Sequence, residues 1–163
     1  MMELNGVMQP MVVATAVGAG ATVLMDAWCW WLRRRGIATL DYAMLGRWCG
    51  HWLKGRWFHA PIQKSPAIRA EKWLGWLLHY LTGVVFAALW LARCGPWPSV
   101  VSALVFGVAT VLLPWLVMQP ALGAGLAASR TARPWQSRGI SLATHAVFGL
   151  GMWGAVWLLQ VFA

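Results

Sequence analysis

The sequence predicts an all-α, polytopic membrane protein in which four transmembrane helices pack as a bundle and a short interfacial helix lies at the cytoplasmic side. Composition is the first reason: 60% of the 163 residues are hydrophobic and only 10% are charged, whereas soluble domains average about 45–50% and about 25%. A soluble core of this size could not bury so many apolar side chains. Segment length is the second reason, because four apolar stretches reach the roughly 20 helical residues that cross a hydrocarbon core.

The predicted spans cover approximately residues 9–32, 73–92, 98–122 and 139–162. Together with two long loops, 33–72 and 123–138, they form a single four-span domain, 1–163. The start of the chain carries Glu3 but no Lys or Arg before the first span. It therefore lacks the basic region that begins a secretory signal, and we expect the first span to persist in the mature protein.

Basic residues predict how the chain is threaded. Twelve Lys and Arg lie in the two long loops, and Arg93 alone lies on the opposite side. Since cytoplasmic loops are enriched in Lys and Arg, we expect both long loops in the cytoplasm and both termini outside it. The net charge of +9 comes from short basic groups between apolar runs rather than from one basic face. This argues against nucleic acid as a partner and favours the lipid bilayer and its anionic headgroups.

The first long loop contains a helical pattern of its own. Asp41 is a suitable N-cap, and apolar residues recur at helical spacing from there to Lys54. The apolar side is formed by Met44, Leu45, Trp48, Cys49, Trp52 and Leu53, and the other side by Arg47, Gly50, His51 and Lys54. This pattern predicts a helix at the membrane interface, with Arg47 directed to lipid phosphates.

Proline and glycine interrupt the third span. Pro114 removes a helical hydrogen bond, and Pro120 is followed by two glycines, so we expect a kink and then unwinding near the cytoplasmic side. The basic loop beyond it contains Ser129, Arg130 and Arg133. An ordinary solvated loop that obeys the orientation rule is the favoured interpretation of these residues. A site for an anionic headgroup or phosphate is the alternative.

Polar residues inside the spans are the strongest indication of a site, because a charge in hydrocarbon is costly and usually faces protein or water. Each of Asp26, His79 and His145 lies seven residues from a Lys or Arg that ends a cytoplasmic loop. At about 1.5 Å per helical residue, the three share one depth, about 10 Å inside the cytoplasmic boundary. Gln119 of the third span belongs to the same half of the bilayer. We expect these four side chains to converge at the bundle centre.

Several roles are compatible with this layer. Hydrogen bonds that only fix the helix register would make it a structural element. Histidine titrates near neutral pH, so a proton-linked or polar-solute pathway is a second role. Paired histidines could ligate a haem b iron, and Asp26 with His79 and His145 could hold a metal ion. We expect no cofactor, and we expect no enzyme because the chain lacks the motifs of hydrolases, P-loop proteins, zinc proteases and dinucleotide enzymes.

Short matches between the two halves are consistent with an internal duplication. Ala21–Leu24 match Ala109–Leu112 at an offset of 88, and His79 with Gly83 match His145 with Gly149 at an offset of 66. Each half would contribute two spans, so the halves would have the same orientation in the membrane. Chance similarity between short apolar stretches stays open as the other explanation.

Stretches from nearly the whole chain resemble one family. They are Leu40-Asp41-Tyr42 with Gly46-Arg47-Trp48, Gly75-Trp76 with His79-Tyr80, residues 117–125 (VMQPALGAG) with Ala128-Ser129-Arg130-Thr131, and Thr144-His145 with Phe148-Gly149. Together they resemble the domain-of-unknown-function 2938 family of small bacterial inner-membrane proteins. The resemblance implies a bacterial multi-span membrane protein, and it supplies no activity, substrate or catalytic residue.

The leading functional hypothesis is a small proton-linked, transporter-like or channel-like protein. Asp26, His79, Gln119 and His145 would form its intramembrane site. A non-catalytic structural or accessory subunit of a membrane complex is the alternative from another class. Because four spans make a narrow bundle, a homodimer or larger complex would supply a pathway more easily.

Overall fold

The computed structural model describes residues 2–95 and 98–161, and over these residues the chain is helical and contains no strand. In chain order the elements are α1 (Met2–Arg34), α2 (Tyr42–Trp52), η1 (Ile62–Lys64), α3 (Glu71–Cys94), α4 (Val100–Ala109), the π-helix η2 (Pro114–Met118), α5 (Gln119–Ala121), η3 (Leu126–Ala128) and α6 (Pro134–Val161). The predicted all-α class is confirmed.

Four helical stretches are long and apolar enough to cross a membrane. They are Pro10–Arg34, Glu71–Cys94, Val100–Ala121 and Pro134–Val161, and they correspond to the four predicted spans. Residue 162, the last of the fourth predicted span, lies outside the described residues. The main difference is that α6 begins at Pro134 rather than at residue 139. Its extra turn is polar and gave no apolar signal: Arg138 donates to the carbonyl of Ala127 (2.8 Å) and lies over the Trp135 ring.

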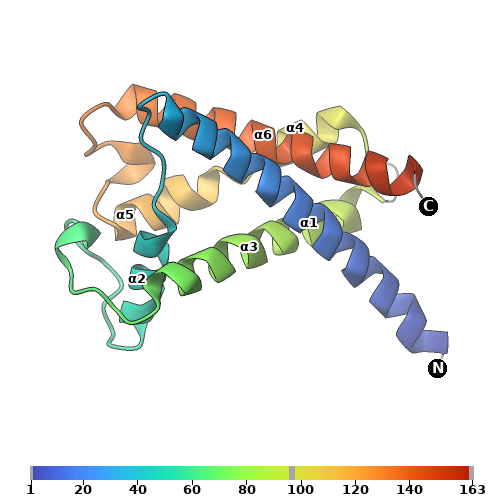
Figure 1. Ribbon diagram of the computed structural model, residues 1–163, viewed down its shortest axis with the longest axis horizontal. Coiled ribbons are helices and arrows are strands. Elements are labelled where there is room, and N and C mark those ends of the chain that lie inside the picture. Colours follow the sequence, from blue (N-terminus) through green and yellow to red (C-terminus); the bar gives the residue numbers. More distant parts are fainter. Residues whose placement is uncertain (1, 96–97, 162–163) are drawn as a thin grey trace.

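The helices pack in the order α3, α1, α6, α4, so that α1 and α6 form the middle of the bundle. α3 and α4 lie at its two sides and make few direct contacts with each other. Both long connections, with α2 and α5, gather at one end of the molecule, whereas α1 starts and α6 finishes toward the other (Figure 1). We call these the loop end and the terminal end.

Glycines allow the close crossings between these helices. A Cβ at Gly18 of α1 would lie 2.7 Å from the carbonyl oxygen of Gly83 in α3. A Cβ at Gly107 of α4 would lie 2.6 Å from the Cα of Gly149 in α6. Without a strong hydrophobic effect between helices in lipid, such close backbone approach is a main source of association. The sequence therefore fixes α1 to α3 and α4 to α6 at positions where only glycine fits.

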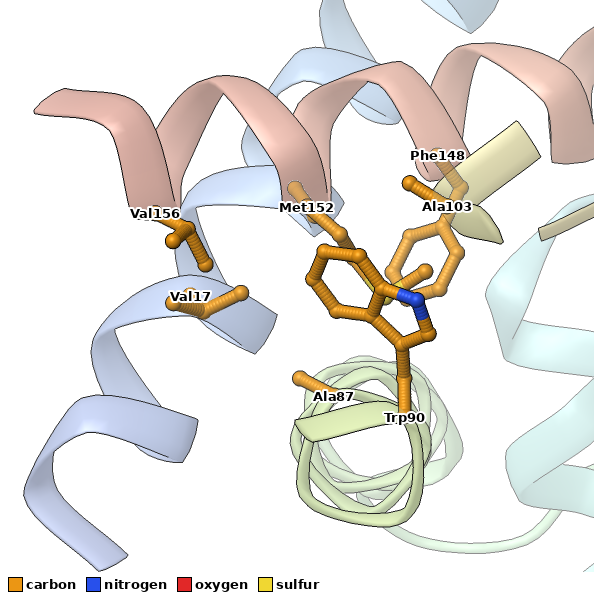
Figure 2. Packing of buried hydrophobic residues seen from close by; sticks show 8 residues of the cluster. Val17, Ala87, Trp90, Ala103, Phe148, Met152 and Val156 are labelled. Atoms are coloured by element: carbon orange, nitrogen blue, oxygen red, sulfur yellow. The ribbon is translucent and has the colours of Figure 1, made fainter. Parts of the chain in front are cut away.

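Buried apolar side chains fill the terminal half of the bundle. Trp90 of α3 is fully buried, and its indole ring stands beside Met152 and Phe148 of α6 (Figure 2). The other buried members of this cluster are Val17 and Ala21 of α1, Ala87 of α3, Ala103 of α4 and Val156 of α6. All four long helices contribute, so the terminal half is closed by a packed apolar core.

The third span is broken, as its prolines predict. α4 stops at Ala109, and a turn and a π-helix carry the chain to Gln119, whose backbone N–H donates to the carbonyl of Pro114. The chain leaves the helix after Ala121 and turns at Gly123 and Gly125, both at positive φ. A Cβ at Gly123 would lie 2.7 Å from the carbonyl oxygen of His59, because the loop after α2 lies directly against this turn.

The predicted helix in the first loop is present as α2, and Asp41 caps it by accepting from the N–H of Ala43 (3.0 Å). Beyond its amphipathic pattern, α2 makes close contacts with α3 and with the third span. α2 crosses α3 so closely that a Cβ at Gly46 would overlap the carbonyl oxygen of Glu71, and one at Gly75 would overlap that of Tyr42. On another side, Trp48 packs with Ile62, Ala121 and Leu122. α2 is therefore built into the loop end.

Candidate functional site

The centre of the candidate site is Asp26 of α1, which receives three hydrogen bonds. The ring Nε2 of His79 lies 3.0 Å from Oδ1, at the distance of a ring N–H that donates to a carboxylate oxygen. The hydroxyl of Tyr42 donates to the same oxygen (3.0 Å), and that of Tyr80 donates to Oδ2 (3.1 Å). The side chains of Asp26 and His79 are 16% and 12% exposed. Both carboxylate oxygens of Asp26 therefore have a donor.

Local packing places these donors. α1 and α3 are held together at Gly18 and Gly83, one to two turns from Asp26 toward the terminal end, so Asp26 comes opposite His79. Tyr42 is the first residue of α2, and its ring stacks on the His79 ring with centroids 4.0 Å apart. Trp76 meets Tyr42 edge-on at 4.7 Å. The imidazole is therefore fixed in orientation by a bond on its edge and a ring on its face.

Sequence reasoning missed the two tyrosines. They are the only tyrosines in a chain with fourteen tryptophans, and both hydroxyls reach the same carboxylate. Two signals were available. A tyrosine hydroxyl can donate a hydrogen bond from the end of the ring, which a tryptophan cannot, and each tyrosine lies within a stretch that resembles the family. Helical spacing alone could not place Tyr42, since it belongs to a loop helix whose docking is a tertiary contact.

His145 of α6 does not contact Asp26. Its Nδ1 lies 2.7 Å from the hydroxyl of Thr110, and this hydroxyl donates to the carbonyl of Gly107 at 2.6 Å. The hydroxyl hydrogen is thereby used, so Nδ1 carries a proton and donates to Thr110. The second imidazole thus belongs to the α4–α6 pair, as the first belongs to the α1–α3 pair.

A cavity of about 550 Å³ at the loop end connects the two imidazoles. His79, Gln119 and His145 all line it, whereas Asp26 is absent from its wall and lies behind His79. A volume of this size is typical of sites for small organic molecules. Three of the four predicted site residues therefore share one cavity, and the fourth acts on it through a hydrogen bond.

Hydroxyl groups mark one face of the cavity along α6. Ser137, Ser141 and Thr144 follow one another at spacings of four and three residues, and His145 continues the face. The Ser137 hydroxyl lies 3.3 Å from that of Thr131, and the Thr144 hydroxyl accepts from the indole of Trp28 (3.2 Å). The hydroxyl of Ser141 between them makes no hydrogen bond to any group in the part of the chain that is described.

Gln119 contributes an unsatisfied group. Its side-chain oxygen Oε1 is buried and has no hydrogen-bond partner among the described residues. Buried polar atoms in folded proteins nearly always have a partner, so such an atom marks a place where a donor from water or a ligand fits. Gln119 holds this position because the π-helix and the turn after it place its backbone carbonyl 2.8 Å from the N–H of Ala124.

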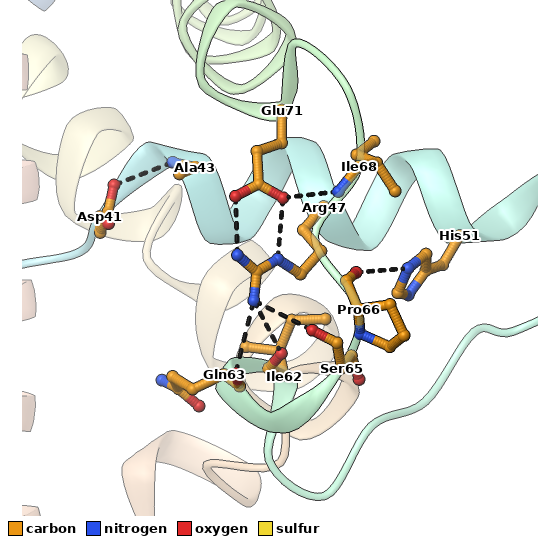
Figure 3. Close-up of polar contacts among 10 residues, drawn as sticks. All are labelled: Asp41, Ala43, Arg47, His51, Ile62, Gln63, Ser65, Pro66, Ile68 and Glu71. Carbon is orange, nitrogen blue, oxygen red and sulfur yellow. Dashed lines mark hydrogen bonds and ion pairs between the residues drawn. The ribbon is translucent and has the colours of Figure 1, made fainter.

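The four residues predicted for anionic headgroups have different positions. Arg130 lines the cavity and is exposed, whereas Ser129 and Arg133 are exposed and do not line it. Arg47 is not turned to lipid, because its guanidinium makes a bidentate ion pair with Glu71 (2.7 and 2.8 Å) and donates to backbone carbonyls including that of Ser65 (Figure 3). Glu71 raises the pKa of Arg47, so this charge serves to join α2, α3 and the loop between them.

A second pair of imidazoles lies outside the spans. His51 Nε2 donates to the carbonyl of Pro66 (3.1 Å), so its Nδ1 accepts from His59 Nε2 at 2.9 Å. His59 is also bonded through its backbone N–H to the carbonyl of Ala121 (2.8 Å). Burial, with the neighbouring His51, lowers the pKa of His59. Among the described residues, no three His, Cys, Asp or Glu side chains come together as metal ligands would.

Comparison with known proteins gives a family and nothing more specific. A family model whose description is "Protein of unknown function (DUF2938)" matches residues 15–159. The matched region includes α3, α4, most of α1 and α6, the cavity and the Asp26 cluster. No curated protein and no solved structure matches the chain.

Proposed function

Because the chain belongs to the domain-of-unknown-function 2938 (DUF2938) family, whose description names no activity, we propose a function from the geometry of the cavity. The protein is a small proton-linked carrier in a bacterial inner membrane, and its solute binds in the cavity at the loop end. Both long loops face the cytoplasm and both termini face outward, in agreement with the basic residues of the loops.

One observation carries this proposal: a cavity of about 550 Å³ has two imidazoles in its wall and lies in a bundle whose other half is packed apolar core. Trp90 and Met152, both fully buried, belong to that core. The cavity lies at the loop end, and the apolar core fills the terminal half behind it. This is the geometry that a carrier has when it is open to one side of the membrane.

The proton would be handled by Asp26 and His79. Intramembrane carboxylates and histidines are characteristic of proton relays, and histidine changes charge in the physiological pH range. His79 stands between the carboxylate and the cavity, with one ring nitrogen bonded to Asp26. A solute that arrives in the cavity therefore meets a group whose charge depends on a proton.

The alternative function is a non-catalytic structural or accessory subunit, and a specific observation supports it. Both oxygens of Asp26 are already bonded, and the cluster joins α1, α2 and α3. In that case the cluster would only fix how these elements pack. Either function would allow a homodimer or a larger membrane complex, and neither requires a haem, a metal ion or a catalytic step.

Liposomes that contain the purified full chain and the trapped pH dye pyranine test the carrier. We expect at least one member of a panel of amino acids, sugars and organic acids to drive a pH change inside wild-type liposomes. Asp26→Asn removes the carboxylate charge and keeps its shape, so it should abolish this change while the protein stays monodisperse. Thr82→Val is the matched control, because the Thr82 hydroxyl only donates within its own helix, to the carbonyl of Leu78.

Two results would count against the carrier. Solute-driven proton movement that persists in Asp26→Asn would remove this carboxylate from the mechanism. Wild-type liposomes that respond to no solute, together with a lower melting temperature of Asp26→Asn, would favour the structural subunit.

A further inference from the structure

The wall of the cavity is divided between an apolar part and a polar part. Met25 of α1, Met44 of α2 and Met118 of η2 all line it, with Leu40 and Ile140. Methionine is unbranched and polarizable, so a wall with three methionines adapts to apolar bodies of different shapes. A fully hydrated solute such as a sugar would leave this part of the wall without suitable contacts.

The polar part of the wall contains an arginine side chain without a partner among the described residues. Arg130 lines the cavity, and its guanidinium makes no hydrogen bond or ion pair with any described residue. Arg138 on the same loop end is by contrast bonded to the carbonyl of Ala127. Thr131, the residue after Arg130, has its hydroxyl 3.3 Å from that of Ser137, so Arg130 lies next to the first turns of α6.

The acidic residues near the cavity are already engaged. Asp41 lines the cavity, and its side chain caps α2 by accepting from Ala43. Asp26 lies behind His79 and accepts from three donors. An incoming anion would find Arg130, whose side chain has no partner among the described residues, and the free hydroxyl of Ser141, whereas Asp41 is bonded through Oδ1 to the start of α2.

We infer that the cavity binds an organic anion with a compact apolar body, such as an aromatic or branched-chain carboxylate. Its carboxylate binds at the Arg130 end, where Ser141 supplies a free hydroxyl, and its body packs on Met25, Met44 and Met118. This inference rests on the proposed function, since the anion would be the solute that the carrier moves. Charge-assisted bonds to arginine are strong and directional, which gives such a site its preference for carboxylate.

Equilibrium dialysis against the full chain in nanodiscs tests the inference, with radiolabelled benzoate, phenylacetate and 3-methylbutanoate as probes. Benzyl alcohol is the uncharged counterpart of benzoate, and empty nanodiscs correct for partition into lipid. We expect saturable binding of at least one carboxylate. Benzyl alcohol, which lacks the charge, should bind about tenfold more weakly than benzoate, a difference of about 1.4 kcal/mol. Arg130→Gln should weaken carboxylate binding by about tenfold, within the usual range for a charged hydrogen bond.

Arg133→Gln is the matched control, because Arg133 is an exposed arginine three residues away and does not line the cavity. Ser141→Trp places a large side chain in the cavity, so it should abolish binding and thereby locate the site. Equal affinity of wild type and Arg130→Gln, or equal affinity for benzoate and benzyl alcohol, would overturn the inference. So would the absence of saturable binding for all three carboxylates.

The inference and the carrier fail in different ways. Saturable carboxylate binding without any proton movement in liposomes keeps the anion site and contradicts the carrier. Proton movement that is driven by an uncharged or cationic solute keeps the carrier and contradicts the anion site.

Discussion

Three hydrogen bonds, rather than a single ion pair, stabilise Asp26 in the apolar bundle. Two phenol hydroxyls and one imidazole reach its two oxygens, and the tyrosine donors come from α2 and α3. A buried carboxylate with a missing donor carries a desolvation cost of about 1–3 kcal/mol. The stability of the cluster therefore depends on each donor being present.

Tyr42→Phe and Tyr80→Phe test this dependence. Each change removes one donor and keeps the ring, so each should lower the free energy of unfolding by about 1–2 kcal/mol. Thermal unfolding in detergent, followed by tryptophan fluorescence, measures the effect. Thr82→Val again serves as the control, because it removes a hydroxyl that bonds only within α3. If both phenylalanine variants unfold like wild type, the tyrosine bonds contribute nothing to Asp26.

His59 makes the loop after α2 sensitive to acid. Its pKa in the folded protein lies below the ordinary value of 6.5 because the ring is buried and His51 is adjacent. As the pH falls below about 6.5, the unfolded loop takes up a proton before the folded loop does, so the folded loop loses stability. The contribution is absent at higher pH, where the ring is neutral in both states.

Hydrogen exchange of residues 57–68, corrected for the intrinsic effect of pH, measures this loss. We expect faster exchange at pH 5.5 than at pH 7.5 in wild type. His59→Gln cannot titrate and should show little difference between the two conditions. A wild-type loop that exchanges equally at both values would show that the imidazole pair does not control it.

At the residue scale, the sequence predicted the contact between Asp26 and His79 from depth alone. It did not predict that His145 bonds Thr110 or that Arg47 bonds Glu71. Depth is set by counting residues along a helix, whereas partners depend on the rotation and tilt of each helix, which a count does not give. Arg47 illustrates this. The sequence placed it correctly on α2, but its partner Glu71 lies 24 residues away at the start of α3.

At the element scale, Gly46 of α2 has the opposite effect to the one that helix propensity indicates. Glycine weakens an isolated helix by about 1 kcal/mol relative to alanine, yet Gly46 is where α2 meets α3. The whole helix owes its position to this contact and to Trp48, which packs under the broken third span.

Gly46→Ala should therefore destabilise the protein. The added Cβ would overlap the carbonyl oxygen of Glu71, and overpacking of this kind costs about 1–3 kcal/mol. Gly139→Ala in α6 is the control, because nothing lies within 4 Å of its added Cβ, and it should be neutral or stabilising by up to about 1 kcal/mol. Thermal unfolding in detergent compares the two. Similar melting of both variants would mean that α2 can shift to accept the methyl group.

The break in the third span was predictable and its form was not. Pro114 and Pro120 predict an interruption, but a π-helix that places Gln119 in the cavity wall depends on the turn at Gly123 and on the loop that packs against it. Ala127 and Ala128 show the same limit, because both have positive φ where glycine would be expected. Contacts with Arg138 and Thr131, which bond their carbonyls, hold this backbone.

At the scale of the whole molecule, the two halves share crossings that the offsets of 88 and 66 relate. Gly83 of α3 is the close contact with α1, and its counterpart in the second half, Gly149 of α6, is the close contact with α4. Thr110, the counterpart of Thr22, bonds His145, whereas Asp26 has Pro114 as its counterpart and bonds His79. A two-fold relation would make α3 contact α4 as α6 contacts α1, and the structure shows few contacts between α3 and α4. The two halves thus have similar helix crossings inside each half, but the contacts between the halves do not follow a two-fold axis.

The weak contact between α3 and α4 has a mechanical consequence. Glycines lock α3 to α1 and α4 to α6, and a Cβ at Gly151 of α6 would lie 2.8 Å from the Cα of Ala21, so the middle of the bundle is locked as well. The flank between α3 and α4 is the remaining seam. Trp90 of α3 and Ala103 of α4 both belong to the apolar core of the terminal half. A rearrangement that opens the terminal half would therefore move α3 away from α4, and the α1–α6 contact would act as the hinge.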